Sequence, residues 1–488
     1  TLRKKGLEHV AQHYSSRTVT FRLRETLRPL VYGKGRNLAL FGQTEDTGEQ
    51  PLVSIVIPCW NNVAYTRLCL DSIFRNTEEP FELILIDNGS TDDTASYFES
   101  LRKQHTNVVV ISNKLNTGYA YACNQGLAAA TGEYVVIMNN DVVLPPNWLR
   151  LLLRAARAPE VGIVGPRANN VSGTQCIATS YGNRLDLMEG FAQALARKNA
   201  YQGSFVVRAV GFCMLVKRSV IETIGGFDPR FGIGNFEDDD FCVRAQLAGF
   251  KIWIADDAFV HHFGSVSFRN GGIDYVRLMR RNFELLKAKW RIAPETQIED
   301  GIPYGEMLRQ GFSKDWHFCP LTPQHLAQEQ YPPVSLLEKR AYHFLIIPDW
   351  ERSGERWAEA IRAFYEAFDA RDDVALLIRI DPLLWPDVSS ILRRLQAWAA
   401  SEKLDLDEEK RLLLVVNDIV PPRGGAAVYR AAHAFIDTAP AGVFNRYAEE
   451  ARACGLTLCQ PNAEDLRNAW MSKRLKKVRC SGPPSLDS

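Results

Sequence analysis

Short apolar segments alternate with helix-like segments from residue 52 to residue 138. The strand-like segments are rich in Val, Ile and Leu and lie at 52–57, 81–86, 108–111 and 134–138. Helix-like segments at 65–76 and near 120–130 lie between them. Apolar runs of this length are typical of buried parallel strands. The alternation therefore predicts a doubly wound α/β sheet, in which ligands bind beyond the carboxyl ends of the strands.

A second alternation of the same kind predicts a second, smaller, Rossmann-like α/β domain over residues 341–475. Residues 294–340 are rich in proline and charged side chains, which predicts a connecting segment with little regular structure. Residues 1–50 mix basic and apolar residues and end in a polar run, which predicts a basic, helical extension and linker. The predicted parts are therefore 1–50, 51–293, 294–340, 341–475 and a disordered tail at 476–488.

Composition and charge exclude several function classes. The 488 residues carry a formal net charge of +1, so no overall field would favour nucleic acid. No apolar run approaches the ~20 residues that span a bilayer. The ten cysteines include no CxxC pair, which favours reduced thiols. We expect a cytoplasmic protein, free or peripheral at the inner face of a membrane, with its oligomeric state left open. The start at Thr1 indicates a fragment or a processed chain.

Two groups of polar residues follow apolar runs and are candidate metal ligands. Asn139, Asn140 and Asp141 follow the segment 134–138, where a carboxylate would project beyond the sheet. Oxygen ligands of this kind suit Mn²⁺ or Mg²⁺. His261 and His262 follow another apolar run, and either imidazole would suit a metal. Helix capping by Asp141 and an ordinary strand-end role for the histidines are the alternative interpretations.

Four consecutive acids, from Glu237 to Asp240, are the candidates for a catalytic base. Adjacent carboxylates repel one another and raise some of their pKa values, which suits one of them to abstract a proton. Acids at a helix N-terminus also complement the helix dipole, so a purely structural role is the alternative. Glycine-containing segments at 225–226 and 232–234 precede the acids and would allow close approach of the backbone to a substrate.

The order and spacing of these motifs resemble family 2 glycosyltransferases of the rhamnosyltransferase-like branch. The matching segments are 53–58, 86–92, 116–118, 122–126, 139–141, 211–215, 225–228, 237–240, His262 with Ser265 and Ser267, and 289–290. The resemblance implies a GT-A fold with a mixed sheet. It also implies sugar transfer from a nucleotide diphosphate donor with inversion, no covalent intermediate, and Mn²⁺ or Mg²⁺ as cofactor.

The resemblance implies roles for particular residues of the first domain. Asp238 would be the general base, with Glu237 and Asp239 as further candidates. The donor-binding residues would be Pro58, Asp87, Asn116, Gly118, Asn124 and Asn140. Of these, Asp87 would bind a uracil or thymine base.

The implied metal ligands depart from the usual family pattern at one position. Asp141 would ligate the metal, together with His262 or His261. Asn139 stands where the family usually has an aspartate, which removes one anionic oxygen and would lower metal affinity.

The second predicted domain resembles the C-terminal lobe of GT-B glycosyltransferases. That lobe often carries two glutamates separated by seven residues. If Glu450 is the second glutamate, the first falls at Gly442, so the pattern is broken. We therefore expect a structural or acceptor-binding domain.

The sequence predicts a metal-dependent inverting glycosyltransferase that uses a UDP- or dTDP-sugar. Its acceptor would be a glycan, a lipid-linked molecule or a protein, in polysaccharide, glycolipid or glycoprotein biosynthesis. An alternative is a catalytically inactive binding or scaffold protein, which Asn139 and the broken glutamate pattern would suit. A nucleotidyltransferase is less favoured, because residues 58–62 do not form a glycine-rich phosphate loop. Acceptor contacts are expected within 169–205 and in the loop before Glu237. Fold analogy does not identify an acceptor that such loops bind.

Overall fold

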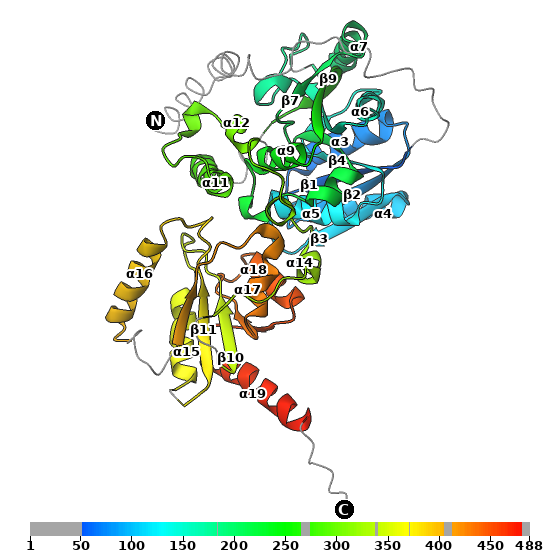
Figure 1. Cartoon of the computed structure of the whole chain (residues 1–488). Coiled ribbons are helices and arrows are strands. Elements are labelled where there is room, and N and C mark those ends of the chain that lie inside the picture. The colour runs from blue at the N-terminus through cyan, green and yellow to red at the C-terminus, as the bar shows by residue number, and fades with distance from the viewer. Residues whose placement is uncertain are drawn as a thin grey trace, which may run out of the picture. The chain divides into compact units, whose positions relative to one another are not determined.

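The computed structural model describes residues 51–182, 184–264, 274–336, 340–369, 371–404 and 412–480 (Figure 1). The chain divides into two compact units, with the boundary between Leu321 and Thr322. The predicted extension 1–50 and residues 481–488 of the predicted tail lie outside the described residues. Within the described ranges, no helix is long and apolar enough to cross a membrane.

The first unit is built on a nine-stranded sheet with the strand order β3-β2-β1-β4-β8-β6-β9-β5, and β7 pairs with β9 (Figure 1). Strands β1 to β4 are parallel, β8 is antiparallel to β4 and β6, and β9 is parallel to β6. The predicted doubly wound mixed sheet is confirmed. The strands are β1 (Val53–Cys59), β2 (Phe81–Asn88), β3 (Val108–Asn113), β4 (Tyr134–Met138), β5 (Val142–Val143), β6 (Val161–Ala168), β7 (Gly203–Val206), β8 (Cys213–Lys217) and β9 (Lys251–His262).

Alternate residues of the central strand β1 pack on opposite faces of this sheet. Ile55 and Ile57 belong to the core that α3, α4 and α6 cover, whereas Val56 belongs to the core that α5, α8 and α9 cover. Burial on both faces explains why β1 is a continuous apolar run. The covering helices are α3 (Val63–Asn76), α4 (Thr94–Gln104), α6 (Trp148–Ala156), α5 (Tyr119–Ala129), α8 (Arg218–Ile224) and α9 (Glu237–Leu247).

Strand β1 continues through Pro58, where the sequence predicted that it would stop. Pro58 pairs with Ile86 of β2, whereas the pairing of β1 with β4 ends at Val56. Proline has no N–H to donate, so it is tolerated where the strand has a partner on one side only.

Residues 294–321 belong to the first unit and contain short helices where little regular structure was predicted. The helices are η4 (Ile298–Asp300), α12 (Tyr304–Met307) and α13 (Lys314–His317). Cys319 forms a bridge with Gly225, and the N–H of Gly226 donates to the Cys319 carbonyl at 2.8 Å. Gly225 has φ +70°, and an added Cβ would lie 1.9 Å from that carbonyl oxygen, so only glycine fits. The first unit therefore extends past residue 293.

The second unit contains a parallel five-stranded sheet with the order β12-β11-β10-β13-β14, as expected for a Rossmann-like domain. Helix α19 continues through Cys480, beyond the predicted domain end at 475. The likeness of this unit to a GT-B lobe stays a prediction. Its elements are α14 (Pro323–Gln328), β10 (Tyr342–Ile346), α15 (Trp357–Ala367), β11 (Val374–Arg379), α16 (Val388–Ser401), β12 (Leu412–Val416), η5 (Pro422–Gly424), α17 (Ala426–Arg430), β13 (Ala434–Ile436), α18 (Arg446–Ala453), β14 (Thr457–Cys459) and α19 (Ala463–Cys480).

Candidate active site

Asn88, the last residue of β2, organises the loop that precedes α5. Its Oδ1 accepts hydrogen bonds from the backbone N–H of Thr117 at 3.0 Å and from Nδ2 of Asn113 at 3.1 Å. Its Nδ2 donates to Oδ1 of Asn116 at 3.0 Å. The side chain is buried, so little water competes for these bonds. Asn88 was not among the predicted site residues, although its place at the end of an apolar strand is a signal that could have found it.

Asp87 lies next to Asn88 and is also buried. Its Oδ1 accepts a hydrogen bond from the backbone N–H of Ser90 at 2.9 Å, which fixes the turn after β2. Gly118 has φ +86°, and an added Cβ would lie 2.6 Å from the carbonyl oxygen of Gly232. The predicted donor-binding residues Asp87, Asn116 and Gly118 are therefore brought together at the carboxyl edge of the sheet.

Other predicted donor-binding side chains are engaged within the protein. The Asn124 amide donates to the Phe227 carbonyl and accepts from the Phe227 N–H, both at 2.8 Å, so it fixes the glycine turn at 225–226. Nδ2 of Asn140 donates to Oγ1 of Thr66 at 2.9 Å. Pro58 is buried within β1. A buried amide must satisfy its hydrogen bonds, and here protein groups do so. A role of these residues in a nucleoside site stays a prediction.

Asp141 and His262 lie side by side and are both buried. Nε2 of His262 is 3.2 Å from Oδ1 of Asp141. Nδ1 of His262 is 2.7 Å from the carbonyl oxygen of Asn170, which can only accept, so we assign the ring proton to Nδ1. Nε2 then presents a lone pair and makes no hydrogen bond, in spite of the nearby carboxylate. A bare imidazole nitrogen beside a carboxylate oxygen suits a bound cation.

His261 lies on the opposite side of β9 from His262, because successive strand residues alternate faces. Its Nδ1 is 2.6 Å from Oη of Tyr181, and its ring also contacts Phe263. Burial, and then the neighbouring His262, lower the pKa of His261 to about 4, so this ring is neutral at pH 7. The sequence left open which of the two histidines would face the metal. In the structure, His262 is the histidine that lies beside Asp141.

The Gly211–Phe212 dipeptide joins the candidate metal ligands to the acidic run. The N–H of Gly211 donates to Oδ2 of Asp238 at 3.0 Å. The carbonyl of Phe212 accepts from the N–H of Asn139 at 2.9 Å, and its ring stacks on His262 with a centroid distance of 5.1 Å. The half-buried Asn139 is thus placed near the candidate metal ligands through its backbone. Gly211 therefore contacts the predicted base, and the adjacent Phe212 contacts two of the predicted metal ligands.

The acids of α9 have different environments. Asp240 is fully buried and bonds Nε of Arg244 at 2.8 Å and Nζ of Lys289 at 2.7 Å. Burial opposes its ionisation, but the two cations outweigh burial and lower the pKa of Asp240. Oε2 of Glu237 has no hydrogen-bond partner, and burial, followed by repulsion from Asp238, raises the pKa of Glu237 well above its usual value.

Asp239 is bound by Arg208 and by Tyr304, neither of which the sequence singled out. Tyr304 lies in the segment that was predicted to be irregular, and no local motif marks it. A lone arginine without a motif likewise gives no signal that distinguishes it from a surface residue.

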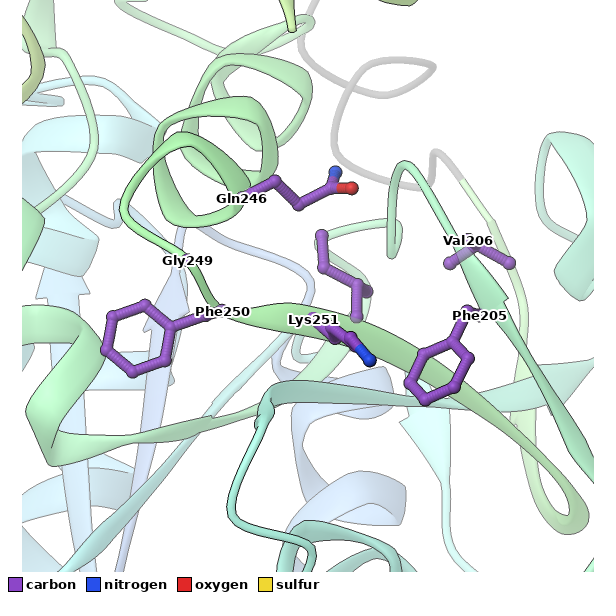
Figure 2. A pocket seen from close by; sticks show the side chains of 7 residues that line it. Phe205, Val206, Gln246, Gly249, Phe250 and Lys251 are labelled. Atoms are coloured by element: carbon purple, nitrogen blue, oxygen red, sulfur yellow. The ribbon is translucent and has the colours of Figure 1, made fainter. Parts of the chain in front are cut away.

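A pocket of about 200 Å³ lies at the other end of β9 (Figure 2). Lys251 begins β9 and lines this pocket, whereas His262 ends the strand, so the pocket is separate from the candidate site. Among the described residues that line it, Lys251 is the ionisable one, and none of them is a carboxylate or a histidine. The lining residues are Phe205, Val206, Gln246, Gly249, Phe250, Lys251 and Ile252.

Among the described residues, no cluster of three or more His, Cys, Asp or Glu side chains could hold a metal alone. The Asp141–His262 pair would therefore need ligands from a substrate or from water. Divalent cations that prefer oxygen ligands often keep such mixed coordination.

Comparison with known proteins gives matches to the first unit. Residues 54–225 match the family model described as glycosyl transferase family 2. The uncharacterized protein y4gI of Sinorhizobium fredii is 29% identical over 255 residues, 49% of this chain and 28% of the relative. The pre-mycofactocin glycosyltransferase of Mycobacterium tuberculosis H37Rv is 30% identical over 213 residues, 43% of this chain and 42% of the relative. This chain therefore matches less than half the length of either relative.

A third relative is matched over more of its length. The N-acetylglucosaminyl-diphospho-decaprenol L-rhamnosyltransferase of Mycobacterium tuberculosis CDC 1551 is 28% identical over 221 residues, 40% of this chain and 70% of the relative. The family match includes Asp87, Asp141 and Phe212 but ends before Asp238 and His262. On this match and the mixed sheet described above, the chain carries a glycosyl transferase family 2 domain.

Proposed function

We propose that this chain is an inverting glycosyltransferase that moves a sugar from a nucleotide diphosphate donor to an acceptor hydroxyl. The observation that carries the proposal is the Gly211–Phe212 junction, which contacts Asp238 through Gly211 and the His262–Asp141 pair through Phe212. Sugar transfer needs a base for the acceptor and a counter-charge for the leaving diphosphate in one place. The N-acetylglucosaminyl-diphospho-decaprenol L-rhamnosyltransferase relative supports a lipid-linked saccharide acceptor.

The nucleoside is assigned to the edge that Asp87 forms with the 116–118 loop. Oδ1 of Asp87 is used by the Ser90 N–H, and Oδ2 would accept the imide N–H of a uracil or thymine base. Asn88 holds the loop against this edge, so the nucleoside would meet a fixed surface. UDP- and dTDP-sugars are therefore the favoured donors.

Asp141 and His262 fit a divalent cation, Mn²⁺ or Mg²⁺. The fit rests on the unpartnered Nε2 lone pair beside the Asp141 carboxylate. When bound, such a cation would neutralise negative charge on the donor diphosphate. Asn139 supplies no anionic oxygen, so the diphosphate itself would complete much of the coordination.

Asp238 is assigned to remove the acceptor proton. Backbone N–H groups of Gly211 and Asp239 hold its two oxygens at 3.0 and 2.9 Å, which fixes the carboxylate. The acceptor oxygen bonds to the anomeric carbon while the carbon–oxygen bond to the diphosphate breaks. The bonding electrons leave with the nucleoside diphosphate, and the proton ends on Asp238. Attack from the face opposite the leaving group inverts the anomeric centre.

Replacement of the base tests this function. Asp238→Asn should lower the transfer rate by about 10²- to 10⁴-fold, because an amide does not accept the proton. Donor affinity, measured by calorimetry, should stay within a few-fold of the wild type. Asp93→Asn, at an exposed aspartate, is the matched control and should leave both quantities unchanged. Wild-type turnover in Asp238→Asn would contradict the mechanism.

A protein that binds the donor without turnover is the second candidate, favoured by the missing carboxylate at Asn139. Donor hydrolysis and calorimetry with UDP-, dTDP- and GDP-sugars, each with and without Mn²⁺, separate the two functions. Metal-dependent binding together with hydrolysis supports the transferase. Binding without hydrolysis or transfer supports the second candidate.

A further inference from the structure

Arg208 and Tyr304 converge on Asp239, the neighbour of the candidate base. Nη1 of Arg208 is 3.1 Å from Oδ1 of Asp239 and 3.4 Å from its Oδ2, and Oη of Tyr304 donates to Oδ1. Nε of Arg208 lies 3.8 Å from Oδ2 of Asp238. Nη2 of Arg208 donates to Oγ of Ser172 at 2.6 Å. One guanidinium therefore contacts both carboxylates.

These contacts leave the guanidinium little freedom. Asp239 is 2% exposed and Tyr304 is 9% exposed, so their hydrogen bond is shielded from water. The planar guanidinium is bound at Nη1 by the Asp239 carboxylate and at Nη2 by the Ser172 hydroxyl, which specifies its orientation as well as its position. Asp239 thus acts as the anchor for a cation that also lies beside Asp238.

Asp238 lies among other buried acids. Among the described residues, the titratable groups that interact with this carboxylate include the cation Arg208, from the connection between β7 and β8. The others are Glu237, Asp239 and Cys242 of α9, Tyr119 of α5 and Tyr275 of α11 (Tyr275–Trp290). Burial raises the pKa of Asp239 to about 6, Arg208 opposes this rise, and Asp238 adds to it. Loss of the cation would leave adjacent buried acids uncompensated.

We propose that Arg208 and Tyr304 are positioning residues for sugar transfer. Asp239, bound by Tyr304, holds the Arg208 guanidinium beside Asp238. The guanidinium keeps the Asp238 carboxylate in its reactive place and charge state. This inference rests on the proposed function. Neither side chain is assigned a contact with the reacting atoms. Tyr304 lies outside the family match at 54–225, so the segment 294–321 supplies part of the catalytic apparatus.

The test measures kcat, KM and the pH profile of kcat/KM for variants of the full chain. Arg208→Gln should lower kcat by about 10- to 100-fold. Its acid limb should move to higher pH by about one unit, because a lost cation makes protonation of the acids easier. The KM for the donor should change less than twofold. Arg208→Lys keeps the charge, so its acid limb should stay in place while kcat recovers only in part.

Tyr304→Phe tests the anchor without changing any charge. It should lower kcat by roughly three- to tenfold, since one hydrogen bond to Asp239 is lost while Arg208 remains. Its melting temperature should stay close to that of the wild type. If Arg208→Gln does not fold, Tyr304→Phe and Arg208→Lys carry the test.

The double variant Arg208→Gln/Asp239→Asn separates positioning from plain charge neutralisation. On the proposed role it should regain the wild-type melting temperature while kcat stays at least about fivefold low, since no cation is held beside Asp238. Recovery of the wild-type kcat would overturn the role. Suppose that Arg208→Gln and Tyr304→Phe keep the wild-type kcat and acid limb while Asp238→Asn is inactive. This result would overturn the positioning role and leave the proposed function standing. Absence of turnover by the wild type with every donor would overturn the proposed function and this inference together.

Discussion

At the scale of single residues, two buried polar atoms of the candidate site have no hydrogen-bond partner. The amides of Asn124 and Asn140 donate hydrogen bonds to Phe227 and Thr66. In contrast, Nε2 of His262 and Oε2 of Glu237 are buried without a hydrogen bond. The sequence identifies residue types at strand ends, so it found Asp141 and His262. It does not reveal which polar atoms other parts of the chain will use, and for that reason it did not predict the bonds between Asn124 and Phe227 and overlooked Asn88.

The two neighbouring histidines allow a sharp test of the metal site. His262→Gln should weaken Mn²⁺ binding in the presence of UDP by more than about 100-fold. Loss of a residue that only hydrogen-bonds to a metal ligand typically weakens metal binding by roughly 10- to 100-fold, and loss of a ligand itself should have a larger effect. His261→Gln should leave Mn²⁺ affinity within a few-fold, because His261 faces Tyr181. Titration calorimetry measures the affinity, and circular dichroism checks that both variants fold. Loss of Mn²⁺ binding in His261→Gln alone would contradict the assignment.

At the scale of elements, the sequence defines strands better than the segments that only tertiary contacts stabilise. The predicted strand at 134–138 coincides with β4, because buried strands are continuous apolar runs. Helices α12 and α13 are too short to be stable through local propensity. The stacking of Trp290 on His317, with centroids 5.3 Å apart, helps to hold α13, and no local pattern encodes that contact.

Helix α11 is joined to α9 by a buried charge that can be removed. Nζ of Lys289 lies 2.7 Å from Oδ1 of Asp240 and 2.9 Å from Oδ2 of Asp228. Lys289→Met should lower the free energy of unfolding by about 3 kcal/mol, near the lower end for a broken buried pair, since Arg244 and Arg230 still bind the two acids.

Urea denaturation at pH 7 measures the effect of Lys289→Met. Lys103→Met is the control, because the Lys103–Glu99 pair is exposed to solvent and should contribute little to stability. Equal stability of the two variants would show that the Lys289 contacts do not stabilise the junction of α9 and α11.

At the scale of the whole molecule, each unit has a separate hydrophobic core. Clusters around β1 belong to the first unit, and those around β10 and β11 belong to the second. The sequence predicted two α/β domains correctly because each has its own alternation. It ended the first domain at residue 293, whereas the contacts end that unit at Leu321. Residues 294–321 carry no strand or long helix of their own, so only contacts distant in the chain reveal where they belong.

Two fragments that end at these two boundaries should therefore behave differently. The fragment 1–321 should fold and bind donor like the full chain, because it keeps the Cys319 bridge, the Tyr304–Asp239 hydrogen bond and the buried Met307. The fragment 1–293 exposes the apolar surface that Met307 and Cys319 cover and leaves Asp239 without Tyr304, so it should melt at a lower temperature and bind donor more weakly. Differential scanning calorimetry with and without UDP-sugar compares the two. Equal melting temperatures and affinities would mean that residues 294–321 are a connection that neither stabilises the first unit nor supports its site.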